Sequence, residues 1–366
     1  MSSSNLDAYD LATVNLDGVI HEDVMSRIWD VSQIPLPFTN MIGSRSHDNQ
    51  YFSWRVDKLQ AQDFDNSVVD GADASGTNDV KTGRRIGNHS QISDKEVYVS
   101  HRAQEVNTIG YANALAYQVT RRQQELRRDV EGMSLLNRGS TEGTDTVAGE
   151  AAGLAAWLTT ANIDGNAAAT NNVSRGAGGA DGGCDATPGD SLVPAATRGT
   201  PEALTETKVR DVVQSVYEQG GGNGSSFGLT AMTTPAVKRK FSEYLFTSSA
   251  RIASLIADGG GSASEREGSG SVDVFLTDYG TLQLVPNRLQ PSFGADPAVH
   301  DNDAMFIIDP SLLELSYLQG YRVDPLAKTG LSDKRQMSVD WSLCVKNWDG
   351  LGGIFDIDPT AAVTTA

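Results

Sequence analysis

Apolar and polar side chains alternate strictly in two segments of the chain. In residues 51–59, Phe52, Trp54 and Val56 share one face, and in residues 337–345 every odd-numbered position is apolar. A period of two residues is typical of a β-strand that buries one of its faces. The pattern therefore predicts one early and one late half-buried strand.

A further early strand is indicated at residues 92–100. The segment that precedes it is rich in aspartate and glycine, includes Asp70 and Asp73, and is too polar to form a core. We therefore interpret residues 51–100 as a long hairpin with a projecting tip.

Helical periodicity is strongest in residues 111–137 and predicts one long helix. A second helix is predicted at residues 205–219, where Gly220 is placed to end it. The apolar stripe of the first helix comprises Leu115, Val119, Leu126, Val130 and Met133.

Shorter elements are predicted in the second half of the chain. Thr234-Pro235 is typical of a helix start, with threonine as the cap and proline in the first turn. Strands are predicted at residues 229–232, 272–276, 282–285, 305–308 and 312–318. Because helices and antiparallel strands occupy separate stretches, the pattern indicates an α+β fold class and no βαβ repeat.

The first forty residues predict an extended arm. Proline restricts the residue before it, so the segment Ile34-Pro35-Leu36-Pro37 must be extended. The arm carries Trp29 and Phe38 in too short a sequence to bury them, so we expect it to lie on the rest of its own subunit or on a neighbour.

Composition excludes several classes of protein. The formal net charge is -18, so the chain as a whole repels phosphate backbones. The two cysteines, Cys184 and Cys344, cannot build a disulfide framework, and no run of 18 apolar residues predicts a membrane span. The N-terminal sequence lacks the features of a signal peptide, so we expect a soluble protein that begins in the cytosol.

The sequence offers little chemistry for an active site. Ser226 matches the pattern of a nucleophile elbow, but a glycine run precedes it where a strand is required. The glycine-rich segment 176–181 resembles a dinucleotide loop but ends in Asp181 in place of glycine. The five histidines show no metal-ligand spacing, so we expect surface or interface roles for them. We predict no catalytic residue, no metal and no cofactor.

The long predicted helix carries the one basic cluster of this acidic chain. A solvated helix face is the first interpretation, with ion pairs at i,i+4 between Arg121 and Glu125 and between Arg127 and Glu131. The alternative is an inward-facing patch that touches packaged nucleic acid or an assembly partner. The cluster consists of Arg121, Arg122, Arg127 and Arg128.

An arm, a projecting hairpin and a glycine-rich loop region all indicate a subunit that is completed by neighbouring copies. The order of these elements resembles that of tailed-phage major capsid proteins with the Hong Kong 97 fold. The likeness is closer to the capsid family typified by an elongated-head podovirus of Escherichia. The matching segments are 84–88, 97–100, 125–129, Val173-Ser174-Arg175-Gly176-Ala177-Gly178-Gly179, 279–282, 285–288, 326–330 and Gly352-Gly353-Ile354-Phe355-Asp356.

The resemblance implies a particular division of the chain, in which the long helix is the spine helix. Residues 1–45 would form the N-terminal arm, 46–100 the extended hairpin loop, 101–145 with 331–350 the peripheral domain, 146–330 the axial domain, and 351–366 a C-terminal segment.

The resemblance also implies a function. The chain would form pentamers and hexamers of an icosahedral head shell in the virion, enclosing double-stranded DNA without sequence-specific binding. A portal and scaffolding or cement proteins would be its partners, and no membrane is involved. We expect contacts between copies at Trp29, Phe38, Phe52, Trp54, Val56, Asp70, Asp73 and Arg175. A serine hydrolase that uses Ser226 and a phage tail or decoration protein are the alternatives.

Overall fold

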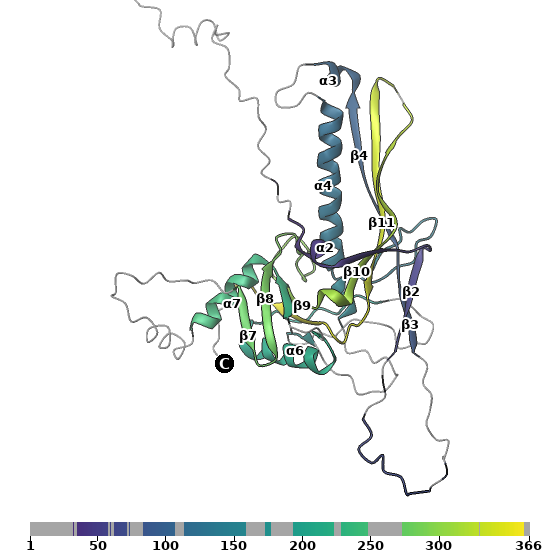
Figure 1. Cartoon of the computed structure of the whole chain (residues 1–366). Helices are drawn as coiled ribbons and strands as arrows, with labels where there is room; N and C mark the ends of the chain where they lie inside the picture. Colours follow the sequence, from purple (N-terminus) through teal and green to yellow (C-terminus); the bar gives the residue numbers. More distant parts are fainter. Residues whose placement is uncertain are drawn as a thin grey trace, which may run out of the picture.

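The computed structural model describes residues 32, 35–57, 59, 62–71, 73, 83–106, 113–158, 173–176, 193–222, 228–247, 273–328 and 330–361. In these ranges the strands form sheets of four, six and two strands. The four-stranded sheet and a long helix extend away from the six-stranded sheet, and the two-stranded hairpin projects in the opposite direction (Figure 1).

The elongated part, which we call the beam, combines helix α4 with a sheet of order β1-β10-β11-β4. In β11 the apolar alternation predicted for 337–345 is confirmed, because every odd-numbered side chain from Met337 to Val345 is at most 1% exposed. The strands are β1 (Gly43–Ser46), β10 (Leu313–Pro325), β11 (Ser332–Val345) and β4 (Gln91–Ser100).

Helix α4 spans Ala114–Leu135 and confirms the predicted long helix. It begins where the Asn113 side chain accepts a hydrogen bond from the backbone N–H of Ala116. Leu126 and Val130 are fully buried against β4 and β11. The remaining stripe residues, Leu115, Val119 and Met133, pack half-buried against the same core.

The hairpin differs from the prediction in its second strand. Strand β2 (Tyr51–Val56) pairs antiparallel with β3 (Arg84–His89), so that Tyr51 lies opposite His89. The predicted partner at 92–100 lies in β4 and pairs with β11. The sequence analysis missed β3 because its sequence, RRIGNH, has no apolar alternation, and periodicity identifies a strand without identifying its neighbour.

The compact part, which we call the body, contains a mixed sheet of order β5-β12-β9-β6-β8-β7. The expectation of antiparallel strands is wrong for three described pairs, because β6 runs parallel to β8 and β5 to β12 in this sheet, and β1 runs parallel to β10 in the beam. The chain leaves β6 through α7 (Pro235–Thr247), and such a helical crossover permits the parallel return. The strands are β5 (Val173–Ser174), β6 (Gly228–Thr233), β7 (Val274–Thr277), β8 (Gly280–Pro286), β9 (Asp303–Ile308) and β12 (Gly352–Ile357).

The predicted helix starts in the body are confirmed. Thr205 accepts a hydrogen bond from the Lys208 N–H at the start of α6 (Glu206–Glu218), and Thr234 accepts one from the Val237 N–H in α7. Gly220 follows α6 with a φ of 83°, a conformation that glycine adopts at little cost. The short helices are α2 (Pro37–Met41), α3 (His101–Glu105), α5 (Leu154–Trp157) and the 3-10 turn Pro310–Leu312.

Two apolar clusters stabilise these parts. The larger cluster joins the beam to the body and contains the fully buried Trp157, Trp341 and Trp348. The smaller cluster lies within the body, where Val209 of α6 and Phe241 of α7 pack on the six-stranded sheet. The hairpin tip belongs to neither cluster.

Candidate assembly surfaces

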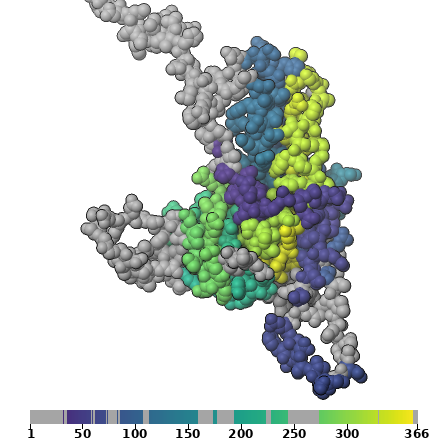
Figure 2. Space-filling model, in the orientation of Figure 1, coloured from purple at the N-terminus to yellow at the C-terminus, as the bar shows by residue number. Residues whose placement is uncertain are grey.

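The tip of the hairpin, residues 59–73 as far as they are described, exposes a concentration of large apolar side chains. Asp70 and Asp73 are exposed on the same tip. Figure 2 shows the described part of the tip, in dark blue, standing away from the rest of the molecule. The exposed fractions are 92% for Leu59, 90% for Phe64, 78% for Val68 and 81% for Val69. Apolar side chains grouped in this way mark an interaction surface.

The apolar face of β2 packs within its own subunit. Phe52 is only 9% exposed, and the Trp54 Nε1–H donates to the Val345 carbonyl at 3.0 Å. The Trp54 ring lies 5.5 Å from the Trp157 ring, and Val56 packs half-buried against the same cluster. Within the chain Phe52 is buried and Trp54 and Val56 are half-buried, and the contact of these residues with a neighbouring copy stays a prediction.

The N-terminal segment is anchored by an acidic side chain of the spine helix. Glu131 is fully buried and accepts hydrogen bonds of 2.8 Å from the backbone N–H groups of Phe38 and Thr39, in the first turn of α2. The Phe38 side chain is 0% exposed. Phe38 therefore has no surface left for a neighbour, which corrects the prediction for this residue. Trp29 lies outside the described residues.

Arg175 is also occupied within the chain. Its side chain is 6% exposed, and its guanidinium lies 4.6 Å from the centroid of the Phe355 ring and 4.0 Å from the Asp356 carboxylate. Val173 and Ser174 pair with Gly353 and Ile354, so two of the matching segments adjoin in space. The guanidinium of Arg175 therefore lies mostly inside the body, and a contact between copies at this residue stays a prediction.

The four arginines of α4 make different contacts within the chain, and the patch that they would form stays a prediction. Arg122 pairs with Glu125, and Arg121 donates to the Tyr117 hydroxyl at 3.2 Å. Arg127 lies 5.3 Å over the Tyr321 ring, and Arg128 is half-buried. The two predicted i,i+4 ion pairs are wrong. Glu125 pairs with Arg122 and not with Arg121, and the Glu131 carboxylate accepts a backbone N–H group of α2.

The stacked pair of Arg127 and Tyr321 lines a surface cavity that the sequence analysis missed. The cavity has a volume of about 300 Å³ and is also lined by Leu36 and Tyr317. Burial raises the pKa of Tyr317 and of Tyr321 above the usual range. No local sequence signal marks this cavity, because α2, α4 and β10 meet there only in the folded chain.

Two histidines at the base of the hairpin were also missed. His47 is 7% exposed and His89 is 8% exposed, so the expected surface or interface role is wrong for both. Desolvation by burial lowers the pKa of each imidazole. Their positions next to predicted strand ends were visible in the sequence, but their burial depends on contacts with distant segments.

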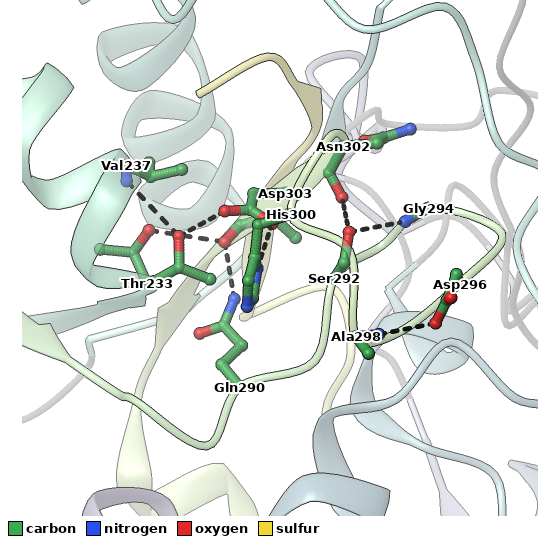
Figure 3. A network of polar contacts seen from close by, with 12 residues as sticks. Thr233, Val237, Gln290, Ser292, Gly294, Asp296, Ala298, His300, Asn302 and Asp303 are labelled. Atoms are coloured by element: carbon green, nitrogen blue, oxygen red, sulfur yellow. Dashed lines mark hydrogen bonds and ion pairs between the residues drawn. The ribbon is translucent and has the colours of Figure 1, made fainter. Parts of the chain in front are cut away.

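A third histidine belongs to a polar network that holds the loop before β9 (Figure 3). The His300 Nδ1 lies 2.9 Å from the Asp303 carboxylate, which also accepts a hydrogen bond of 2.6 Å from the Thr234 hydroxyl. Gln290 donates to the Ala304 carbonyl at 2.7 Å in the same region. These bonds fix the loop against the start of α7, because Asp303 is fully buried between them.

The remaining candidates give no further site. Ser226 and residues 177–181 lie outside the described residues. In the part of the chain that the structure describes, no group of three or more His, Cys, Asp or Glu residues could hold a metal ion. Among these same residues, no helix combines the length and the apolar character needed to cross a membrane.

Comparison with known proteins gives consistent matches. The family described as SU10 major capsid protein matches residues 5–358. The chain is 32% identical over 106 residues to the major capsid protein of Escherichia phage Phieco32, an alignment that covers 29% of this chain and 30% of that protein. The chain therefore aligns with less than a third of the length of that relative.

Solved structures resemble nearly the whole chain. The capsid of cyanophage Pam1 superposes with a TM-score of 0.55 at 12% identity, covering 99% of this chain and 100% of that chain. The capsid of cyanophage P-SCSP1u superposes with a TM-score of 0.54 at 12% identity, covering 96% of this chain and 98% of that chain. At such identity the likeness concerns the fold.

Proposed function

The chain belongs to the SU10 major capsid protein family and has a Hong Kong 97-type α+β fold, and from this premise we propose that it is the self-assembling shell subunit of a tailed-phage head. In this role it forms pentamers and hexamers of an icosahedral shell that encloses double-stranded DNA. It is made in the cytoplasm of the bacterial host and remains in the virion.

The observation that carries the proposal is the exposed hairpin tip. Phe64, Val68 and Val69 are 78% or more exposed and lie within six residues of one another, whereas Phe52 and Ile86 in the two strands of the hairpin are at most 9% exposed. Covering each such side chain contributes about 1.5–3 kcal/mol. A second copy that covers the tip gains this free energy, and a ring of copies gains it at every contact.

The charge of the chain supports a container role. A net charge of -18 gives the wall little attraction for the phosphates of packed DNA, so the genome slides along it and no base sequence is recognised. Arg122 pairs with Glu125, and Arg127 lies over the Tyr321 ring. These contacts within the chain support the interpretation of α4 as a solvated helix face over that of a patch for nucleic acid.

The architecture supports a separate role for each part of the subunit in the shell. The beam with α4 serves as the peripheral domain and the body as the axial domain around the capsomer axis. Residues 1–45 act as an arm and the projecting hairpin covers the adjacent subunit through Asp70, Asp73 and the apolar tip. A portal and a scaffolding or cement protein complete the particle.

Electron microscopy of the purified full-length chain tests the proposal. We expect shells, tubes or rings of pentamers and hexamers. A uniform monomer at high concentration contradicts the proposal. Trimers or rings without curvature would favour a tail or decoration protein.

Variants of the tip test the observation itself. Replacing Phe64, Val68 and Val69 by serine should leave the circular dichroism and the unfolding transition unchanged, because these side chains are exposed, but should abolish the assemblies. The matched control is Val147→Ser, which changes a 50% exposed valine outside the tip and should assemble normally. Normal shells from the triple variant would contradict the assigned role of the tip.

A further inference from the structure

The root of the hairpin is held by a buried imidazole that contacts both of its flanks. His47 precedes β2, and its Nε2 lies 2.7 Å from the hydroxyl of Ser90, which follows β3. Its Nδ1 lies 2.8 Å from the hydroxyl of Ser316 in β10. His47 therefore joins the two ends of the hairpin to each other and to the sheet of the beam.

The two hydrogen bonds of His47 require that one ring nitrogen be unprotonated. A neutral imidazole has one N–H group and one bare nitrogen, so it donates to one of these two hydroxyls and accepts from the other. Protonation makes both ring nitrogens donors, and the hydroxyl that had donated must then turn its proton away. Ser316 is 0% exposed and Ser90 is 6% exposed, so little solvent is available to replace the lost acceptor.

A second buried imidazole lies at the first residue pair of the hairpin. His89 pairs with Tyr51, and the two rings are 4.9 Å apart. The Nδ1 of His89 is buried and has no hydrogen-bond partner among the described residues. Both ring nitrogens of a charged imidazole carry protons, so proton uptake would leave a buried donor unsatisfied.

We propose that His47 and His89 together form a proton-sensitive hinge, which holds the hairpin on the beam when both imidazoles are neutral and releases the root when they are protonated. The hinge is a property of the single subunit and goes beyond the proposed shell function. Its consequence is that mild acid changes the direction in which the apolar tip projects.

Charged groups face both histidines. Asp48 raises the pKa of His47 and Arg45 of β1 lowers it. These three residues line a surface pocket together with Arg85 of β3. Glu142, after α4, faces His89 and favours its charged form. In both cases desolvation is the largest effect and lowers the pKa below the ordinary value of 6.5.

The lowered values fix the sign and the window of the effect. The unfolded or released root takes up protons near pH 6.5, whereas the closed root takes them up only at lower pH, so the closed state loses stability as the pH falls below about 6.5. Burial raises the pKa of Asp340 in β11, and protonation of this carboxyl acts in the opposite direction.

Hydrogen–deuterium exchange of the full-length chain tests the hinge. After correction for intrinsic exchange, we expect protection at residues 47–56 and 84–90 to fall at least fivefold between pH 7.5 and pH 5.5. Protection in β11 at residues 337–345 should stay constant and serves as the internal reference. No change at the root, or an equal loss in β11, would overturn the proposal.

Substitutions identify the groups responsible. The double variant His47→Gln and His89→Phe keeps hydrogen-bonding groups at one position and a ring at the other, and it should lose the pH dependence. The control His101→Gln changes a 40% exposed histidine beside Asp333 at the far end of the beam and should respond as the unmodified chain does. An unchanged response in the double variant would contradict the assignment.

A measurement on the unmodified chain covers the case in which the double variant does not fold. Nuclear magnetic resonance of the histidine ring carbons should show two imidazoles whose pKa lies below the ordinary value of 6.5. Five ordinary titrations would overturn the proposal independently of any variant.

Discussion

The side-chain amide of Asn287 donates a hydrogen bond of 2.8 Å to the carboxylate of Glu131, although 156 residues separate the two in sequence. Both residues are at most 1% exposed. The same carboxylate accepts the N–H groups of Phe38 and Thr39, so one acidic side chain joins the spine helix, the segment after β8 and the N-terminal segment. The carboxylate of Glu131 therefore helps to hold the segment at residues 38 and 39 on the subunit, together with the buried Phe38 side chain.

Replacing Glu131 by glutamine should destabilise the chain by about 1–3 kcal/mol, because an amide nitrogen cannot accept the N–H groups that the carboxylate oxygens accept. Urea unfolding measures the change, and proteolysis after residue 41 should accelerate. The control Glu125→Gln removes a partly exposed ion pair on the same helix and should change the stability by less than about 0.5 kcal/mol. Equal effects of the two substitutions would show that Glu131 has no special role.

Replacing Leu126 by aspartate should unfold the beam. Leu126 is 1% exposed in the interface of α4 with the sheet, and an unpaired charge there costs several kcal/mol. We expect loss of the cooperative unfolding transition and insoluble protein. Thr120→Asp, at an exposed position of the same helix, should remain folded. A soluble, cooperative Leu126→Asp variant would show that the stripe does not form the core.

Replacing Asp356 by asparagine should destabilise the body by about 1–3 kcal/mol. Asparagine tolerates the φ of 56° at this position, but the buried guanidinium of Arg175 loses its counter-charge. Differential scanning calorimetry measures the change. Asp211→Asn, on the exposed face of α6, is the control and should be neutral. A neutral Asp356→Asn would mean that the counter-charge is not needed to stabilise Arg175 beside the aromatic rings and the Thr197 carbonyl.

Cys344 should resist thiol reagents in the folded chain. The side chain is 1% exposed, and burial raises the pKa of its thiol to about 12, so the reactive thiolate is scarce at neutral pH. In a Cys184→Ser variant, which leaves Cys344 as the single thiol, labelling should be slow in buffer and fast in denaturant. Rapid labelling of the native protein would contradict the burial of β11.

The sequence by itself determined the elements that follow one regular period. The alternation at 337–345, the stripe of Leu126 and Val130, and the cap at Thr234 each depend on residues close in sequence, and all are confirmed. Short segments that keep their order along the chain also predicted a capsid family and its fold. The family model that matches residues 5–358 confirms the capsid family.

Only the tertiary structure decided how these elements pair and which residues are buried. Strand β3 has no apolar alternation. Strand β8 lies parallel to β6, which requires that the chain cross over through α7 after it leaves β6. Phe38, Phe52 and Arg175 look like surface residues of an extended chain, but partners far away in sequence bury them. Side-chain periodicity records whether a residue faces a core, whereas the identity of the covering partner depends on long-range packing that no local pattern encodes.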